Sequence, residues 1–188
     1  MSKAVLEIED LHTYFPTKEG VVKAVTDISL TLTENGVLGL VGESGSGKTV
    51  TALSVLQIVP FPGKTVQGSI RYKGTDLLSL DDEQMRPIRG KEISLIFQDA
   101  TSALNPVIPI GQQVEEIFLE HTTMGKNQVR SVTIELLAKM GIPEAKRMLN
   151  SYPFQLSGGM AQRVMLAIGL ALKPQVLIAD EPTSNLDV

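Results

Sequence analysis

The chain has 188 residues, of which 43% are hydrophobic and 20% are charged, and its formal net charge is −4. This length and composition are typical of a globular chain with one substantial core. The acidic balance argues against a nucleic acid partner, because proteins that neutralise many phosphates usually carry a basic face. The absence of cysteine excludes disulfides, zinc–thiolate sites and thiol catalysis, and His12 and His121 show no metal-ligand spacing.

The sequence shows neither a recognisable signal peptide nor an apolar segment long enough to span a membrane. Residues 1–10 contain acidic residues and a lysine instead of the basic and apolar regions of a signal peptide. The longest apolar stretch, residues 164–172, is too short to cross a bilayer. We therefore expect a cytoplasmic chain that reaches a membrane only by docking to another protein.

The first half of the chain reads mainly as strands. Residues 5–11 and 21–33 predict strands separated by a turn at 16–20, which begins with Pro16 and ends with Gly20. Residues 37–41 predict a short, fully apolar strand that leads into a glycine-rich loop. A helix is expected over 48–59, ending near Pro60 and Pro62.

The second half alternates strands with helices, which favours an α/β fold. Residues 68–72 and 93–97 predict strands. Residues 98–155 then show helical periodicity, and we interpret them as a helical insertion within the α/β core. The core is expected to resume with an apolar helix around 164–172 and a buried strand at 176–179. No linker divides the chain into two domains.

Residues 42–49 read GESGSGKT and match the phosphate-loop pattern GxxxxGK[ST]. Glycines allow the loop to wrap closely around a polyphosphate, and the N-terminus of the following helix attracts the anion. Lys48 would reach the outer phosphates, and the Thr49 hydroxyl would bind Mg²⁺. The nucleotide-binding candidates in this loop are Gly42, Ser44, Gly45, Gly47, Lys48 and Thr49.

Two acids, Asp180 and Glu181, follow the apolar residues 176–179. Asp180 could hold Mg²⁺ through water, and Glu181 could orient and polarise an attacking water. Without the phosphate loop, the pair could equally be a strand that leaves the core into a charged turn. Because two neighbouring carboxylates repel each other, a bound metal ion would reduce that repulsion.

A second candidate anion site is the segment LSGGM at 156–160, where Ser157, Gly158 and Gly159 open a helix. A simple helix cap would explain this pentapeptide equally well. One chain needs only one phosphate loop for one ATP, so a second site makes sense if it completes the nucleotide pocket of a partner chain.

The phosphate loop, LSGGM and the segment VLIADE at 176–181, in this order, resemble the nucleotide-binding domain of ABC transporters. The segment ISLIFQD at 93–99, followed by LNP at 104–106, resembles the glutamine loop of that family. The words YPFQL at 152–156 and EPTSNLD at 181–187 are similar to those of oligopeptide, dipeptide and nickel importers. The resemblance covers essentially the whole chain.

The resemblance implies roles for further residues. Gln98 would act at Mg²⁺ and the attacking water, although from the residues alone it could be an ordinary polar strand end. Ser157 and Gly159 would contact the γ-phosphate of ATP held by the opposite chain, and Asp187 would lie in the loop that crosses the dimer interface. Phe15 would stack on adenine, with Tyr14 as the alternative; either could instead be a core aromatic.

The chain departs from the family pattern at three places. Phe154 stands where the peptide-importer ATPases commonly have histidine, and Ala161 stands where they commonly have arginine. The family's switch histidine lies on a later strand, beyond Val188, and neither histidine of this chain can replace it. We therefore expect a single nucleotide-binding domain over 1–188 that is C-terminally incomplete after the D-loop. Its core would be about 1–97 and 156–188, and its helical subdomain about 98–155.

The resemblance implies an α/β P-loop NTPase of the ABC type, with a β-rich N-terminal portion, a RecA-like core and the helical subdomain. Its cofactors would be ATP and Mg²⁺, and it would energise an importer of peptides or nickel from the cytoplasmic side of the membrane. Its partners would be a second nucleotide-binding domain and permease subunits, the latter contacted through residues 101–106, and indirectly a substrate-binding protein. Two alternatives remain: a module that binds ATP without hydrolysing it, and an ABC ATPase that acts outside transport.

Overall fold

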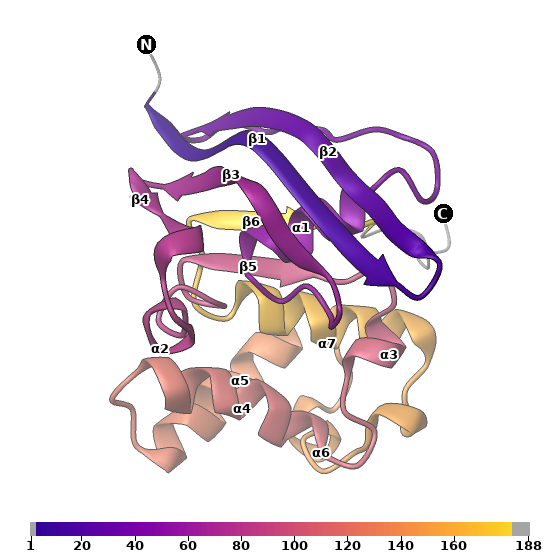
Figure 1. The fold of residues 1–188 in the computed structure, drawn as a ribbon. Coiled ribbons are helices and arrows are strands. Elements are labelled where there is room, and N and C mark those ends of the chain that lie inside the picture. The colour runs from indigo at the N-terminus through magenta and orange to yellow at the C-terminus, as the bar shows by residue number, and fades with distance from the viewer. Residues whose placement is uncertain (1–2, 182–188) are drawn as a thin grey trace. The chain divides into compact units, whose positions relative to one another are not determined.

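The computed structural model describes residues 3–181. The chain divides into two compact units, one on each side of Arg86–Pro87. The predicted boundaries of the core and the helical subdomain were drawn differently, at 97 and 155. Figure 1 labels the helices and strands of both units.

The first unit contains a four-stranded antiparallel sheet with the strand order β2-β1-β3-β4 (Figure 1). Its strands are β1 Ala4–Thr17, β2 Gly20–Thr33, β3 Lys64–Tyr72 and β4 Thr75–Asp76. β1 and β2 form a hairpin in which Thr17 faces Gly20, as the turn signals predicted. The strands expected at 5–11, 21–33 and 68–72 are therefore confirmed.

Helix α1, Lys48–Val55, packs on one face of this sheet. The alternation of β1 places Leu11 and Thr13 on that face, where both are fully buried. The Thr13 hydroxyl lies 2.9 Å from that of Ser54 in α1, so a hydrogen bond joins strand and helix. Two short helices, η1 Leu77–Ser79 and α2 Asp82–Met85, complete the unit.

The strand predicted for residues 37–41 is wrong. The described residues include no strand that pairs with this segment, and its backbone has no regular structure. Its side chains are exposed, with Val37 at 100%, Val41 at 94% and Leu40 at 46%. An apolar run can form a strand only where a neighbour accepts and donates its backbone hydrogen bonds, and hydrophobicity alone does not provide one.

The second unit combines a short parallel sheet with a group of helices. Strands β5 Ile93–Ile96 and β6 Val176–Ala179 pair in parallel, with Ile93 opposite Val176 and Ile96 opposite Ala179. The helical elements are α3 Ala100–Ala103, α4 Ile110–His121, α5 Lys126–Lys139, α6 Ala145–Met148, η2 Pro153–Gln155 and α7 Gly158–Leu170. The helical character predicted for 98–155 and the apolar helix around 164–172 are confirmed.

The core of the second unit lies where α4, α5 and α7 meet. Val114 and Phe118 of α4, Leu137 of α5 and Val164 of α7 are buried there. Helix α7 also packs against β5: a Cβ added at Gly169 would lie 2.9 Å from Cγ1 of Ile96. The glycine therefore lets the helix approach the strand closely.

The expectation that residues 176–179 form a buried strand is only half right. The strand exists, but within the described part of the chain it pairs on one side only, with β5. Val176 is buried, whereas Leu177 is 41% exposed. A strand with one paired edge and one covered face keeps part of its surface in solvent. None of the helices within residues 3–181 is both long and apolar enough to cross a bilayer.

Candidate functional site

The phosphate-loop residues lie in the first unit and form an exposed turn that ends at the N-terminus of α1. Gly45 and Gly47 have φ values of 81° and 94°, in the left-handed region that favours glycine. Gly47 is the N-cap of α1, and no side chain caps the helix there. A Cβ at Gly47 would lie 2.3 Å from the carbonyl oxygen of Ala24 in β2, so only glycine fits between the loop and the sheet.

Lys48 folds back over the loop that precedes it. Its ammonium group donates to the carbonyl oxygens of Gly42, at 2.8 Å, and Glu43, at 2.9 Å. Both bonds hold the loop closed and place the positive charge at its centre. The first turn of α1 contains no acidic residue, so the positive end of the helix dipole is not neutralised locally. A loop of this kind attracts a polyphosphate anion.

The two aromatic candidates for adenine stacking, Phe15 and Tyr14, occupy opposite faces of β1. Phe15 shares the α1-facing side with Thr13, and its ring lies against Gly63, where an added Cβ would be 2.3 Å from Cε1. Phe15 pairs with Val22 of β2, two residues from the Ala24 carbonyl that touches Gly47. Val22 and Ala24 are about 7 Å apart along β2, so Phe15 and the phosphate loop approach the same stretch of this strand.

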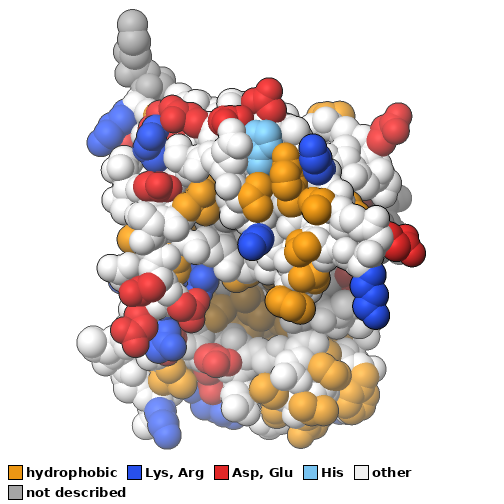
Figure 2. All heavy atoms as spheres, viewed as in Figure 1, with side chains coloured by type: hydrophobic (Ala, Val, Ile, Leu, Met, Phe, Trp, Pro, Cys, Tyr) orange, Lys and Arg blue, Asp and Glu red, His pale blue; other side chains and the backbone are white. Residues whose placement is uncertain are grey.

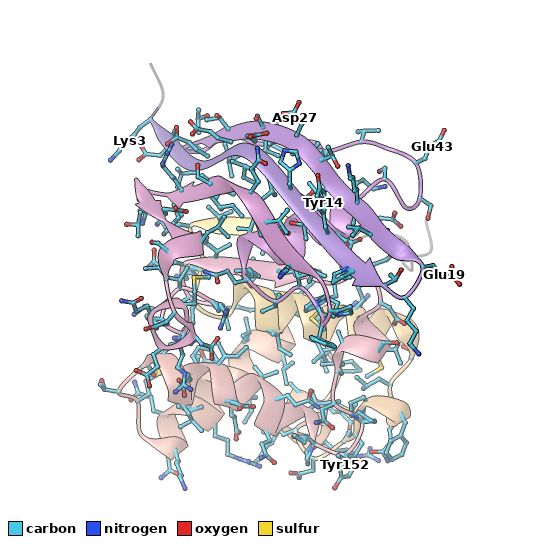
Figure 3. All side chains as sticks on the ribbon, in the orientation of Figure 1. Lys3, Tyr14, Glu19, Asp27, Glu43 and Tyr152 are labelled. Carbon is cyan, nitrogen blue, oxygen red and sulfur yellow. The ribbon has the colours of Figure 1, made fainter. Side chains whose placement is uncertain are left out.

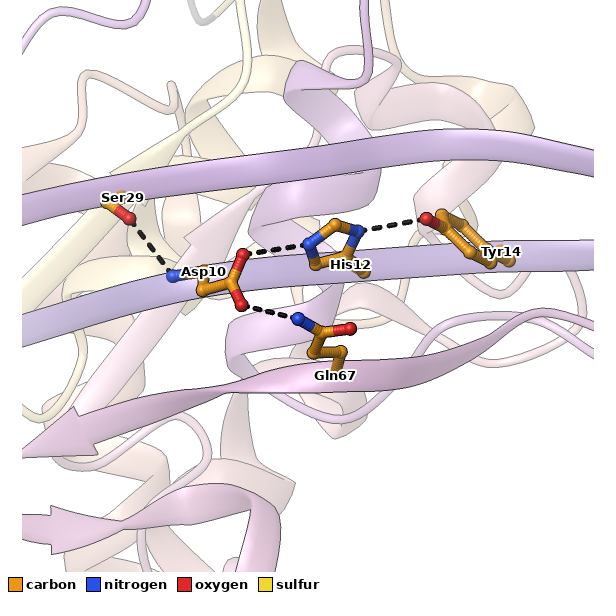
Figure 4. A network of polar contacts seen from close by, with 5 residues as sticks. All are labelled: Asp10, His12, Tyr14, Ser29 and Gln67. Carbon is orange, nitrogen blue, oxygen red and sulfur yellow. Dashed lines mark hydrogen bonds and ion pairs between the residues drawn. The ribbon is translucent and has the colours of Figure 1, made fainter.

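Tyr14 takes part in a polar network on the other face of the sheet (Figure 4). The His12 ring is hydrogen bonded to the Tyr14 hydroxyl through Nδ1, at 2.9 Å, and to Asp10 through Nε2, at 2.8 Å. Gln67 of β3 donates to the second carboxylate oxygen of Asp10, at 2.5 Å. The hydrogen bond with His12 is the main cause that lowers the pKa of Asp10, followed by that from Gln67. The Tyr14 hydroxyl is therefore engaged within the sheet, and the stacking of adenine on Phe15, with Tyr14 as the alternative, remains a prediction.

The second unit brings together three of the residues predicted around Mg²⁺ and the attacking water; the fourth, Thr49, belongs to the first unit. Asp180 and Glu181 follow β6, and Gln98 follows β5. Since the two strands are parallel and in register, their carboxyl ends meet at one edge of the sheet. The Asp180 amide donates to the Ile96 carbonyl at 3.0 Å, and the Gln98 side-chain amide donates to Glu181 Oε2 at 2.5 Å.

The residues that follow β6 and β5 at this edge each have a distinctive backbone feature. Glu181 has a φ of 45°, which is uncommon for a residue other than glycine. After Gln98, Asp99 caps the short helix α3 by accepting from the amides of Thr101 and Ser102. The side chain of Ser102 also donates to Asp99, and this bond is the main cause that lowers the pKa of the Asp99 carboxyl. The cap therefore holds the start of α3 directly after Gln98.

The LSGGM segment forms the start of α7. Ser157 is the N-cap, and its hydroxyl accepts from the Met160 amide at 3.3 Å. A Cβ added at Gly158 or Gly159 would meet nothing within 4 Å, so the glycines border open space. Ser157 therefore caps the helix, as one of the two interpretations of LSGGM expected. The glycines beside it leave the amides of the first turn accessible to an anion.

Two features of the site were not predicted. The hydrogen bond between Gln98 and Glu181 has no local sequence signal, although the register of two parallel strands could have suggested it. The stacking of Tyr152 on Phe154 just before α7 was also not predicted. The spacing of two residues between these aromatics could have suggested it. Asp187 lies outside the described residues, and its expected role in the D-loop remains a prediction.

Comparison with known proteins identifies relatives that match nearly the whole chain. A peptide import ATP-binding protein of Brucella abortus is 48% identical over 98% of this chain. The dipeptide transport ATP-binding protein DppD of Bacillus subtilis is 44% identical over 98% of this chain. Both alignments cover 55% of the relative, so the chain spans about half the length of the curated relatives it matches.

The fold agrees with solved ATP-binding cassettes. A dimeric structure of the cassette MJ0796 bound to ADP and Pi superposes with a TM-score of 0.85 and 27% sequence identity. The superposition covers 97% of this chain and 76% of the MJ0796 chain. The predicted fold class, an α/β P-loop ATPase of the ABC type, is therefore confirmed.

The sequence family described as ABC transporter matches residues 25–184. This range includes the phosphate loop, Gln98, the start of α7 and both acids at the end of β6. The chain therefore belongs to the ABC transporter family.

Proposed function

We propose that this chain binds ATP with Mg²⁺ and hydrolyses it as the energising subunit of a peptide importer. The observation that carries the proposal is the hydrogen bond between Gln98 and Glu181 at the carboxyl edge of β5 and β6. It places an amide beside a carboxylate that can orient water, as hydrolysis of a phosphoanhydride requires. The phosphate loop in the first unit would provide the anion site that the same reaction needs.

The first unit would bind the nucleotide. Backbone amides of the loop between Gly42 and Gly47 and the N-terminus of α1 would hold the phosphates, and Ser44 lies exposed in the same turn. Lys48 would exchange its bonds to the Gly42 and Glu43 carbonyls for phosphate oxygens. Phe15 would then lie beside the adenine, since the hairpin register brings it near the loop.

The second unit would contribute the groups that act on the γ-phosphate. Glu181 would accept a hydrogen bond from the attacking water, and Gln98 would orient that water or the carboxylate. The groups predicted to bind Mg²⁺ are the Thr49 hydroxyl, the Gln98 amide oxygen and the Asp180 carboxylate. All are oxygen ligands, which suit Mg²⁺, and no cluster of three His, Asp or Glu within residues 3–181 could hold a metal without the nucleotide. Bound Mg²⁺ would offset negative charge on the phosphates.

The proposed partners are a second copy or a related nucleotide-binding chain, and permease subunits at the cytoplasmic side of the membrane. Ser157 and Gly159 would contact the γ-phosphate of the ATP held by the second chain; the open space at the start of α7 supports this role. The names of the matched relatives refer to peptides and dipeptides, which favours peptides over nickel as the substrate class.

The test is steady-state phosphate release from Mg-ATP by the purified full-length protein and by its Glu181→Gln variant. We expect turnover to fall by about 10²-fold or more in the variant while ATP binding persists, because the change removes the charge that polarises water. Glu19→Gln, the same change at the exposed turn of the hairpin, serves as the control and should keep full turnover (Figure 3). ATP binding without turnover by the wild-type protein would contradict the proposal and indicate a nucleotide-binding module.

A further inference from the structure

The aromatic pair Tyr152 and Phe154 lies at the surface, just before α7. The two rings are stacked, with centroids 5.6 Å apart and an interplanar angle of 12°. Phe154 is 72% exposed. Because one face of its ring lies against Tyr152, the exposed area belongs mainly to the opposite face and the edges. Figure 3 labels Tyr152 at the surface, and Figure 2 shows hydrophobic side chains gathered in the same area of the view.

The turn that carries this pair is held by its own hydrogen bonds. Residues Pro153–Gln155 make the short helix η2, whose first residue is buried. The Tyr152 amide donates to the side-chain oxygen of Gln155 at 2.8 Å, and the Gln155 amide donates to the Tyr152 carbonyl at 3.0 Å. A ligand that stacks on Phe154 therefore loses little free energy in ordering the ring.

The position of the pair relates it to the start of α7. The amide groups of the first turn of a helix point toward its N-terminal side, from which residues 152–156 approach Ser157. Phe154 is three residues before Ser157, so their Cα atoms are at most about 11 Å apart. The ribose and triphosphate of one nucleotide can bridge such a distance. A phosphate at Ser157 and a planar ring on Phe154 can therefore belong to the same molecule.

We propose that Phe154, supported by Tyr152, stacks on the adenine of the ATP whose γ-phosphate contacts Ser157 and Gly159. This inference rests on the proposed function, because that nucleotide is held by the phosphate loop of a second copy. Each ATP would then touch aromatic rings of two chains, Phe15 of one and Phe154 of the other. Stacking uses the flat face common to all bases, so Phe154 contributes affinity without distinguishing adenine from guanine.

The experiment uses the full-length Glu181→Gln protein, which would retain nucleotide, and 2-aminopurine riboside triphosphate as a fluorescent probe. Dimer formation is followed by sedimentation, and the probe's emission reports stacking. We expect extra quenching when dimers form, and we expect Phe154→Ala to remove that extra quenching. The same change should raise the nucleotide concentration for half-maximal dimer formation at least about fivefold. Phe154→Tyr should restore both values, and the control Val107→Ala, at a 77% exposed apolar position, should alter neither.

Two results would overturn the inference. If Phe154→Ala dimers quench the probe as strongly as the parent, the ring does not contact the base. If the variant forms fewer dimers but keeps the same quenching per dimer, Phe154 contacts the partner protein instead of the nucleotide. Absence of nucleotide-dependent dimers in every variant, the parent included, would reject the proposed function and this inference with it.

Discussion

Replacement of Gly47 by alanine should destabilise the protein, because the phosphate loop leaves no room for a Cβ there. Its φ is 94°, and an added Cβ would lie 2.3 Å from the Ala24 carbonyl oxygen. The left-handed conformation costs a residue with a Cβ about 1–2 kcal/mol. The clash is with backbone of β2, which cannot rotate away, and such overpacking typically costs about 1–3 kcal/mol more. Gly47→Ala should therefore lower the free energy of unfolding by about 2–5 kcal/mol.

Gly45 provides the matched control. Its φ is 81°, but an added Cβ would meet nothing within 4 Å. Gly45→Ala should therefore show only the conformational cost of about 1–2 kcal/mol. The difference between the two variants isolates the steric contact between the loop and β2.

The assay is urea unfolding of both variants, followed by circular dichroism and extrapolated linearly to zero denaturant. We expect Gly47→Ala to unfold at a distinctly lower urea concentration than Gly45→Ala and to bind ATP more weakly. Equal midpoints for the two variants would refute the close contact between Gly47 and the Ala24 carbonyl. A loss of ATP affinity with unchanged stability would indicate a role in binding that is separate from packing.

Three further predictions concern the cores and the polar network. Leu11 is fully buried, so Leu11→Ala should destabilise the protein by about 2–5 kcal/mol in the same urea assay; a loss below about 1 kcal/mol would contradict its place in the core. Gly169→Ala should cost about 1–3 kcal/mol, because its Cβ would press on Ile96, whereas Gly125→Ala, which meets nothing, should be tolerated. The pKa of Asp10 lies below its ordinary value of 3.8, chiefly through its hydrogen bond with His12. A lowered pKa stabilises the fold above the unfolded value and ceases to do so as the pH falls through the folded value. The stability advantage of the wild type over Asp10→Asn should thus be present near pH 5 and shrink below pH 3.8, and a difference independent of pH would contradict the assignment.

Much of the site was predictable from the sequence because its parts are local. The phosphate loop needs glycines at positions with positive φ, and Gly45 and Gly47 occupy such positions. Asp180 and Glu181 were expected at a strand end because an apolar run stops there, and β6 ends at Ala179. The serine and glycines before an apolar helix indicated the start of α7, where Ser157 is the N-cap.

Contacts between distant segments depended on the tertiary structure. Local hydrophobicity predicted a strand at 37–41, but a strand requires a hydrogen-bonding neighbour, and these side chains are exposed. Spacing predicted Phe15 for adenine with Tyr14 as the alternative, but only the tertiary structure shows that the two rings lie on opposite faces of β1. The bond between Gln98 and Glu181 joins residues 83 positions apart through the register of β5 and β6. The sequence alone determined which chemical groups are present and which local structures hold them. Only the tertiary structure decided which of those groups meet, because register and packing depend on segments far apart in the chain.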